Sequence, residues 1–266
     1  MRYLFDVWED FSNACLAASH IIFLSDYDGT LTPIVSRPED ALISTEMKER
    51  LTDLAKVPKF SVGIVSGRGL EEVQSMVGIG EIYYAGNHGL EIRGPGIDYI
   101  NPEAEQSIAV INELAARFEE LFRSTEGIII QNKKLSMSVH YRLVKPDDEP
   151  MVEMTVRNTV KPYIDNRKVR LFPGKKVWEI RPPMNWDKGK AVQSIQDIIR
   201  KKEQKDDILT VFLGDDTTDE DGFRVVQPPD GWSIYVGPES MSSAAGHYLK
   251  DTGEVGRLLQ RLAGLR

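Results

Sequence analysis

Short apolar runs alternate with helical patterns in the first part of the chain. Apolar residues dominate Ile21–Leu24 and Phe60–Val65, as is typical of strands buried on both faces of a parallel sheet. A helical pattern follows each run, over residues 46–56 and 70–77, and a third strand is predicted over 81–85. This β-α-β-α-β order predicts an α/β fold built on a doubly wound parallel sheet.

The pattern changes over residues 105–183. Helices are predicted over 106–123 and 149–164, whereas strands such as 136–142 alternate apolar and polar residues. Such alternation suits an antiparallel sheet with one polar face. A hairpin is expected around Pro173-Gly174. We therefore interpret residues 105–183 as an inserted α+β domain.

The α/β pattern resumes after residue 183, with a helix over 188–203 and an apolar strand over 209–213. The predicted core thus comprises residues 1–104 and 184–266, interrupted by the insertion. A compact insertion of this kind commonly serves as a lid.

Charge and composition exclude several classes of function. The net charge of −8 argues against non-specific binding to nucleic acid, which depends on clustered Lys and Arg. Cys15 is the single cysteine, so no internal disulfide can form. No stretch approaches the roughly 18 apolar residues of a membrane span, and acidic residues stand where a signal peptide would be apolar. We expect a cytoplasmic monomer that binds neither membranes nor nucleic acid.

The first chemical motif is Asp26-Tyr27-Asp28-Gly29-Thr30, directly after a predicted strand. Ligands of open α/β sheets bind beyond the carboxyl ends of strands. Residues two apart on a continuing strand point the same way, so Asp26 and Asp28 are expected to face one site. One carboxylate can attack phosphorus, and the other can protonate the leaving oxygen and then activate water. Gly29 permits the turn, and the Thr30 hydroxyl could hold a phosphoryl oxygen or the loop. Alone, the motif leaves a solvated acidic turn as the alternative.

Three further motifs follow strands or begin a helix. Ser66-Gly67-Arg68 follows the second strand and offers a hydroxyl for a phosphate oxygen. Lys188 begins a helix, where the helix dipole already favours anions. Gly214–Asp221 is rich in carboxylates, which repel one another unless a cation such as Mg²⁺ binds. An acidic turn that caps the next helix is the simpler interpretation, and it fits Asp219–Asp221 better than Asp215 and Asp216.

Taken together, these motifs resemble those of the haloacid dehalogenase-like superfamily of phosphohydrolases. The resemblance implies that Asp26 is the nucleophile and Asp28 the general acid/base. It implies that Ser66 and Lys188 bind the phosphoryl group. It also implies that Mg²⁺ is held by Asp26, the Asp28 backbone carbonyl and Asp215, with Asp216 or Asp219 as further ligands. The position of the insertion resembles the larger α/β cap type of that superfamily.

Several stretches are similar to those of the trehalose-6-phosphate phosphatases. They are the motifs above together with Gly86-Asn87-His88-Gly89 and Gly174-Lys175-Lys176-Val177-Trp178-Glu179-Ile180-Arg181-Pro182. In that family the cap reads the hydroxyls of the disaccharide. The resemblance implies substrate contacts from the insertion at Arg142, Lys176 and Glu179, and from the core at Thr30, Gly67, Arg68, Asn87 and His88.

Other interpretations remain open at this stage. Lys176 and Glu179 could form an ion pair within the hairpin, His88 could be a satisfied turn residue, and Arg142 a surface arginine. The substrate could be another sugar phosphate, such as sucrose phosphate or a glycosyl-glycerol phosphate. A non-catalytic regulatory domain should lack some of the motif aspartates, which are all present. A dinucleotide-dependent oxidoreductase needs Gly-x-Gly-x-x-Gly after the first strand, and the chain has none there.

Overall fold

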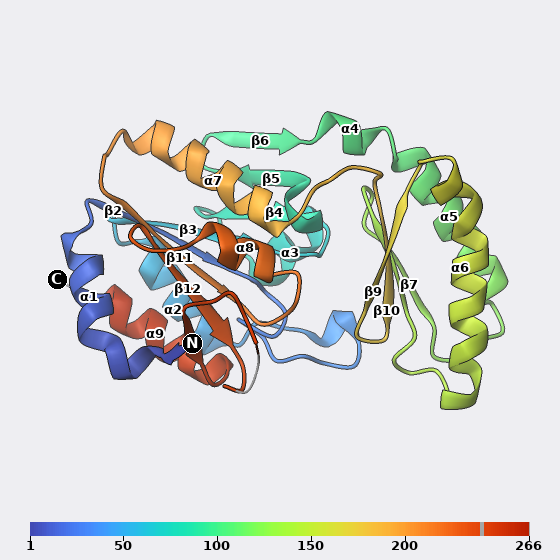
Figure 1. Ribbon diagram of the computed structural model, residues 1–266, viewed down its shortest axis with the longest axis horizontal. Helices are drawn as coiled ribbons and strands as arrows, with labels where there is room; N and C mark the ends of the chain where they lie inside the picture. The colour runs from blue at the N-terminus through green and yellow to red at the C-terminus, as the bar shows by residue number, and fades with distance from the viewer. Residues whose placement is uncertain (240–241, 266) are drawn as a thin grey trace. The chain divides into compact units, whose positions relative to one another are not determined.

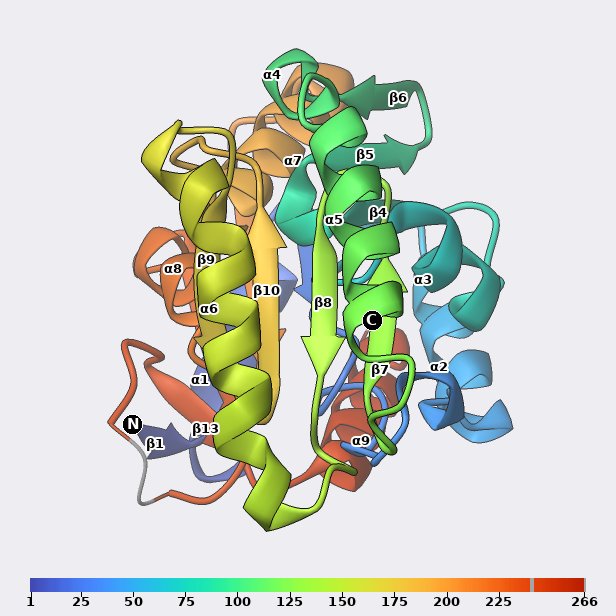
Figure 2. The same ribbon diagram turned by 90° about the vertical axis from the view of Figure 1, so that its right-hand side faces the viewer.

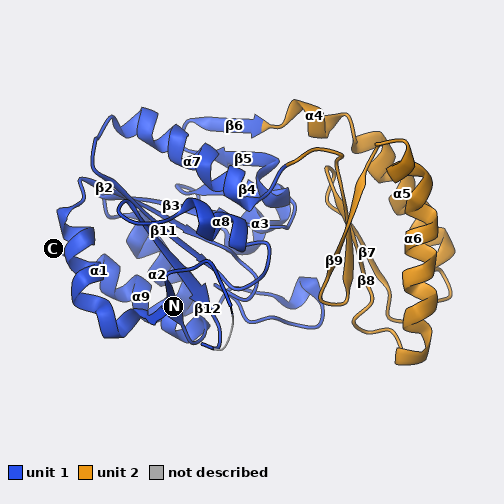
Figure 3. Ribbon diagram, viewed as in Figure 1, with its two compact units in different colours: residues 1–99, 186–266 blue, residues 100–185 orange. Residues whose placement is uncertain are grey.

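The computed structural model describes residues 1–239 and 242–265. The chain forms two compact units (Figure 3): unit 1 comprises residues 1–99 and 186–266, and unit 2 comprises residues 100–185. The predicted insertion, residues 105–183, lies inside unit 2. No helix among the described residues is both long enough and apolar enough to span a membrane.

In unit 1, nine strands of the described chain form one sheet in the order β1-β13-β12-β11-β2-β3-β4-β5-β6. Their bounds are β1 Arg2–Tyr3, β2 His20–Ser25, β3 Phe60–Val65, β4 Tyr83–Gly86, β5 Glu91–Gly94, β6 Ile97–Ile100, β11 Ile208–Gly214, β12 Gly231–Val236 and β13 His247–Leu249. Neighbouring strands from β1 to β4 are parallel. The prediction of an α/β fold with a parallel sheet is confirmed. Strand β5, which pairs antiparallel with β4, and the edge strand β6 were not predicted.

The central strand β2 shows why the sheet is covered on both faces. Ile21 and Phe23 belong to one apolar core, whereas Ile22 and Leu24 belong to the other, because successive side chains of a strand point to opposite faces. Helices pack on each side (Figure 1). The first core is covered by α1 Trp8–Ala17, α2 Thr45–Ala55, α3 Leu70–Val77 and α9 Thr252–Ala263. The second is covered by α7 Lys188–Glu203 and α8 Glu220–Val225. Short 3₁₀ turns occupy Leu4–Val7, Pro38–Asp40 and Asn87–Gly89.

Side-chain caps fix where the helices near the site begin. The Ser44 hydroxyl accepts a hydrogen bond from the Met47 amide at the start of α2. The Asp187 carboxylate accepts one from the Lys190 amide at the start of α7. Both are typical N-cap residues. The second cap places Lys188 at the first position of α7, as the sequence predicted.

Unit 2 is a four-stranded antiparallel sheet with two helices against one face (Figure 2). The strands are β7 Ile129–Asn132, β8 Met137–His140, β9 Arg170–Gly174 and β10 Val177–Arg181, in the order β7-β8-β10-β9. The two helices against the sheet are α5 Ile108–Leu121 and α6 Glu149–Asp165. The unit also contains the short helix α4 Pro102–Glu105 and a 3₁₀ turn over Pro146–Asp148. Phe118 of α5, Val156 of α6 and Trp178 of β10 belong to its core.

The predicted hairpin exists, but its turn was placed wrongly. Gly174 pairs with Val177, so the turn consists of Lys175 and Lys176, not of Pro173-Gly174. Lys176 adopts a positive φ of 63° there. Pro173 lies within β9, which is an edge strand of the sheet, and proline is tolerated on edge strands because its missing N–H is not needed by a second neighbour.

Candidate active site

Three motifs converge at the carboxyl ends of adjacent parallel strands. Asp26 follows β2, Ser66 follows β3 and Asp215 follows β11, and β2 lies between the other two strands. The Asp26 amide continues the pairing by donating to the Leu213 carbonyl at 2.9 Å. Ligand sites of open α/β sheets form at this edge, so the topology assembles the residues that the sequence scatters.

Lys188 joins two of the buried carboxylates. Its Nζ lies 2.9 Å from Asp26 Oδ1 and 2.8 Å from Asp219 Oδ1, and its side chain is only 2% exposed. Burial lowers the pKa of Lys188, but the opposite charges of Asp219 and Asp26 outweigh burial and raise the pKa well above the usual value. Lys188 is therefore a fixed positive charge beside Asp26.

The carboxylates in this group are crowded. Burial, together with the negative charges of Asp215, Asp216 and Asp28, raises the pKa of Asp26 to about 7, although Lys188 opposes the shift. Burial likewise raises the pKa of Asp219 well above its usual range. One lysine does not balance the charge, so a cation would stabilise the ionised group.

The donor set fits a divalent metal. Carboxylate oxygens of Asp26, Asp215 and Asp219 all lie within 4.8 Å of one another, and all three residues are buried. Hard oxygen donors of this kind suit Mg²⁺. Gly29 makes room for the group: a Cβ at this position would lie 2.2 Å from Asp215 Oδ2, and its φ of +82° also favours glycine.

Asp219 has a different role from the helix cap that the simpler interpretation gave it. Its Oδ1 accepts from Lys188, and its Oδ2 accepts from the backbone amides of Asp215 and Asp216. Its side chain makes no capping bond to α8. Asp219 therefore organises the acidic loop and holds Lys188. The sequence offered only a weak signal for this role, the spacing of four residues from Asp215.

Asp216, a predicted metal ligand, uses one oxygen inside this loop. Its Oδ1 accepts from the Thr218 amide and hydroxyl, both at 2.7 Å. Burial raises the pKa of Asp216, but Lys188 and the bonds from Thr218 outweigh burial and lower it. The geometry thus gives Asp216 a loop-forming role and leaves only its other oxygen for a metal.

Asp28 is not among the three carboxylates that lie within 4.8 Å of one another, although its charge contributes to the raised pKa of Asp26. Strand β2 ends at Ser25, so the two-residue alternation that would align Asp26 with Asp28 does not continue. The Asp28 carboxylate instead accepts two bonds from Arg68, from Nε to Oδ2 at 2.7 Å and from Nη2 to Oδ1 at 2.8 Å. Arg68 was predicted to contact the substrate, yet the protein itself occupies its guanidinium.

The Ser-Gly-Arg and Gly-Asn-His-Gly motifs form one interlocked pair of turns. The Asn87 amide donates to the Arg68 carbonyl, and the His88 amide donates to the Ser66 carbonyl. A Cβ on Gly67 would lie 2.8 Å from the His88 ring, so only glycine leaves space for that ring. The Ser66 hydroxyl accepts from the Arg68 amide at 3.1 Å.

Glu91 is a site-supporting residue that the sequence analysis missed. It is buried, and its Oε1 accepts from Asn87 Nδ2 at 2.6 Å. Asn87 and His88 have positive φ angles of 50° and 57°, an uncommon conformation for residues other than glycine. Glu91 from β5 therefore stabilises a strained turn. An acidic residue four positions after Asn87 was the only signal, and β5 itself was not predicted.

Thr30 is the remaining core residue of the predicted site. Its side chain is fully buried, and its hydroxyl has no hydrogen-bond partner among residues 1–239 and 242–265. Buried hydroxyls are normally paired. An unpaired one beside the Asp26 loop fits a site that receives another polar group.

In unit 2, Glu179 lies on the polar face of the sheet. It accepts from Lys133 Nζ at 3.3 Å and from Arg181 Nε at 2.9 Å. Lys176 instead pairs with Glu149, so Lys176 and Glu179 do not form the hairpin ion pair considered above. Lys133, whose side chain is 6% exposed, was not predicted.

Neighbouring positions make this sheet face polar. Glu179 is registered opposite Ser138, which is registered opposite Gln131. The Ser138 hydroxyl is buried without a hydrogen-bond partner in the described part of the chain. Arg142, by contrast, is bonded through Nη2 to the Lys175 carbonyl at 3.2 Å, near the hairpin turn.

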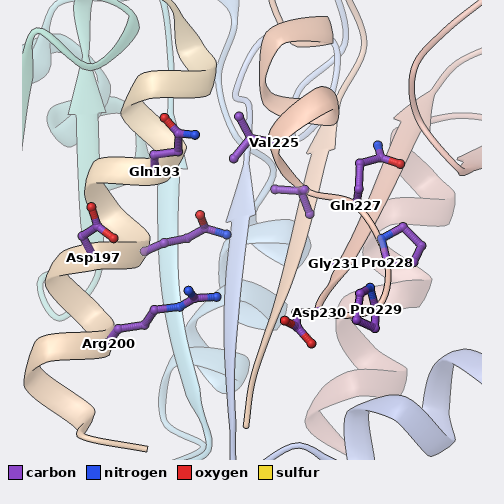
Figure 4. A pocket seen from close by; sticks show the side chains of 11 residues that line it. Gln193, Asp197, Arg200, Val225, Gln227, Pro228, Pro229, Asp230 and Gly231 are labelled. Carbon is purple, nitrogen blue, oxygen red and sulfur yellow. The ribbon is translucent and has the colours of Figure 1, made fainter. Parts of the chain in front are cut away.

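A cavity of about 500 Å³ lies elsewhere in unit 1, between α7 and the segment that follows α8 (Figure 4). Its lining includes Gln193, Asp197 and Arg200 from α7. None of the predicted site residues lines it. Gln196 and Gln227, which also line it, already bond to Thr210 and to the Phe223 carbonyl. The acidic group, and not this cavity, carries the reactive side chains.

The fold of the chain is similar to that of a haloacid dehalogenase-like hydrolase. A solved hydrolase of that class from Bacteroides thetaiotaomicron superposes with a TM-score of 0.61 at 15% identity over 91% of this chain and 99% of that chain, which supports the fold alone. The family model for trehalose-phosphatase matches residues 24–251. The chain belongs to the trehalose-phosphatase family, and it is accordingly a phosphatase.

Individual relatives agree with this assignment. The chain is 36% identical to trehalose-phosphate phosphatase B of Arabidopsis thaliana over 267 residues, which cover 97% of this chain and 70% of the relative. The C-terminal domain of the C. albicans trehalose-6-phosphate phosphatase superposes with a TM-score of 0.81 at 27% identity, covering 97% of both chains.

Proposed function

We propose that the protein hydrolyses trehalose 6-phosphate to trehalose and phosphate through an aspartyl-phosphate on Asp26. The observation that carries the proposal is the buried contact of Lys188 with Asp26 at the end of β2, beside Asp215. A buried lysine beside the candidate nucleophile supplies a fixed positive charge that a phosphoryl group can contact.

The reaction takes two steps. A carboxylate oxygen of Asp26 bonds to phosphorus while the bond from phosphorus to the sugar oxygen breaks, and Asp28 donates a proton to that leaving oxygen. Water then attacks phosphorus, Asp28 accepts a proton from the water, and Asp26 is released with inorganic phosphate. Lys188 and Ser66 hold the phosphoryl oxygens, with the Lys188 charge offsetting the negative charge of the group.

Mg²⁺ is the cofactor that fits this donor set. Asp26, Asp215 and the Asp28 backbone carbonyl would hold it, with Asp219 or Asp216 supporting the loop. When bound, the metal neutralises charge on the phosphoryl oxygens and on Asp26. The crowding that raises the pKa of Asp26 to about 7 supports the proposal, because a nearby cation would keep Asp26 ionised for attack.

We further propose that unit 2 acts as a cap that recognises the sugar through the polar face around Glu179 and Lys133. A disaccharide offers many hydroxyls, and a site that hydrogen-bonds them rejects a wrong sugar because its own buried polar groups would then stay unpaired. The unpaired Ser138 hydroxyl on the same face is one such group. Lys176 and Arg142 near the hairpin turn are further candidate contacts, as are Asn87 and His88 in unit 1.

Phosphate release from a panel of sugar phosphates tests the proposal. Trehalose 6-phosphate should be clearly preferred over sucrose 6-phosphate and glucose 6-phosphate, measured as kcat/KM with Mg²⁺ present. Excess EDTA should stop the reaction. A preference for another sugar phosphate would overturn the substrate assignment, and a full rate in EDTA would overturn the metal assignment.

A further inference from the structure

Arg68, which has no part in the reaction described above, is the buried centre of an ion network. Its guanidinium donates to both oxygens of Asp28, to Glu72 on α3 and to the Pro38 carbonyl at 2.8 Å. The Arg68 side chain is 7% exposed. Burial lowers the pKa of Arg68, but its hydrogen bonds to Asp28 and Glu72 and their negative charges outweigh burial and raise the pKa above its usual value.

These contacts argue against a direct substrate contact by Arg68. A guanidinium has five N–H donors, and four hydrogen bonds to the protein already engage all three of its nitrogens. Only one N–H, on Nη1, is left for a sugar hydroxyl. The arrangement instead resembles a support that fixes the orientation of its neighbour.

Asp28 is the neighbour that needs such support. It follows the end of β2 in a loop, and its side chain is 40% exposed. An exposed carboxylate samples several rotamers, whereas proton transfer requires a well-defined geometry. Two parallel N–H donors from a buried arginine fix both the position and the plane of a carboxylate. Glu72 and Pro38 in turn fix the guanidinium.

We propose that Arg68 is a positioning residue that acts through Asp28, holding its carboxylate for proton transfer while Glu72 and the Pro38 carbonyl hold Arg68. The proposal rests on the proposed function, because it presupposes that Asp28 is the general acid/base. It assigns the arginine of the Ser-Gly-Arg motif to proton transfer and not to sugar recognition.

A double-mutant cycle on the full chain tests the proposal. The variants are Arg68→Met, Asp28→Ala and the double variant, assayed as kcat/KM on trehalose 6-phosphate and on p-nitrophenyl phosphate. The nitrophenolate leaves without a proton, whereas a sugar alkoxide requires one. We expect Arg68→Met to lower kcat/KM on the sugar phosphate about tenfold or more, and that on the aryl phosphate by less than about threefold.

The double variant gives the decisive result. If Arg68 acts through Asp28, the double variant loses no more activity on the sugar phosphate than Asp28→Ala alone, because residues that act as a unit are not additive. Multiplied losses would overturn the proposal and would indicate that Arg68 contacts the substrate directly. If Asp28→Ala lowered kcat/KM equally on both substrates, the assignment of Asp28 as general acid/base would be wrong. The proposal for Arg68 would then be wrong as well.

Two further variants distinguish the positioning of Asp28 by Arg68 from an effect of the Arg68 charge and from an effect on folding. Arg68→Lys keeps the charge without the two parallel donors and should recover only part of the loss, so full recovery would overturn the proposal. Arg93→Met is the matched control, since Arg93 donates hydrogen bonds to Asp98 and Gln74 and lies outside the proposed site. This variant should leave kcat/KM unchanged on both substrates. Thermal melts should show folded protein for Arg68→Met, because Asp28 and Glu72, at 40% and 31% exposed, can hydrate when their partner is removed.

Discussion

Lys188 is bonded to two buried carboxylates, Asp26 and Asp219, and Asp215 belongs to the same group. Three carboxylates therefore share one lysine in the interior of unit 1. Burying charges that are not fully compensated is unfavourable by several kcal/mol for each ion. The buried charges suit the proposed reaction but destabilise the fold, so substitution of Asp26 should change both the activity and the stability.

Asp26→Asn should abolish turnover and stabilise the metal-free protein at alkaline pH. Burial, together with the neighbouring negative charges, raises the pKa of Asp26 to about 7 in the folded state, compared with about 4 in an unfolded chain. The folded state retains a proton that the unfolded state releases as the pH rises from about 4 to 7, so the stability of the wild type falls across that window. Asparagine stays neutral, and Lys188 keeps Asp219. We expect the variant to gain on the order of 1 kcal/mol at pH 8.

Urea unfolding in EDTA at pH 5 and pH 8 measures this effect. The difference in unfolding free energy between Asp26→Asn and the wild type should grow with pH. Added Mg²⁺ should reduce this difference, because a ligand that binds the folded wild type stabilises the wild type. A variant that is less stable than the wild type at pH 8 in EDTA would argue against the crowding. A variant that keeps a tenth of the wild-type turnover would argue against Asp26 as nucleophile.

The sequence predicted which residues lie close together better than it predicted how they pair. Asp26, Lys188 and Asp215 were identified because each follows a strand or begins a helix, and topology brings such positions together. The partners of Arg68 and Asp219 depend on side-chain directions beyond the strand ends. Once β2 stops at Ser25, the two-residue alternation carries no information about Asp28.

At the level of elements, the turn after β3 and the turn after β4 support each other. Backbone hydrogen bonds join residues 66–68 to residues 87–88, and the His88 ring occupies the space that a side chain on Gly67 would need. Because Ser66 and Arg68 flank Gly67, any displacement of His88 should be transmitted to both.

Gly67→Ala should therefore lower phosphatase activity on sugar and aryl phosphates alike. The added Cβ would lie 2.8 Å from the His88 ring, and the buried ring would have to shift, which should lower kcat/KM about tenfold or more. Gly80→Ala is the matched control, since a Cβ there has no neighbour within 4 Å and should leave activity unchanged. Both variants should be assayed in parallel. If Gly67→Ala kept the same kcat/KM as Gly80→Ala, the two turns would not depend on each other.

Elements with a strong periodic pattern were predicted well, and short elements were not. The strand Phe60–Val65 and the helix Leu70–Val77 have the predicted bounds. Strands β5 and β6 have four residues each; β5 ends at Gly94, and β6 begins just after Gly96. Their local sequence is therefore more typical of a turn than of a strand. They form because β4 presents an edge that β5 can pair with, which is a property of the sheet and not of the segment.

At the scale of the whole molecule, the change of periodicity revealed that one unit interrupts the other. Continuous apolar strands before residue 105 and after residue 183 require a sheet covered on both faces, whereas the alternating strands between them require a sheet with one polar face. The sequence could not show which polar residues occupy that face. Lys133 contributes to it because β7 and β8 bring its segment near Glu179, a long-range consequence of strand pairing.

The proposed role of unit 2 as a cap predicts that substitutions in unit 2 alter substrate selection more than they alter the chemical step. Glu179→Ala should lower kcat/KM on trehalose 6-phosphate about 10²-fold, because the loss of a charged acceptor leaves sugar hydroxyls unpaired. The same variant should change kcat/KM on p-nitrophenyl phosphate by less than about twofold, since that substrate offers no hydroxyls.

Asp165→Ala is the matched control, because Asp165 is also a carboxylate of unit 2 paired with a lysine, Lys161, but on the exposed side of α6. The ratio of the two kcat/KM values is the measurement. If Glu179→Ala reduced both substrates equally, Glu179 would act through the structure of unit 2 and not through the sugar.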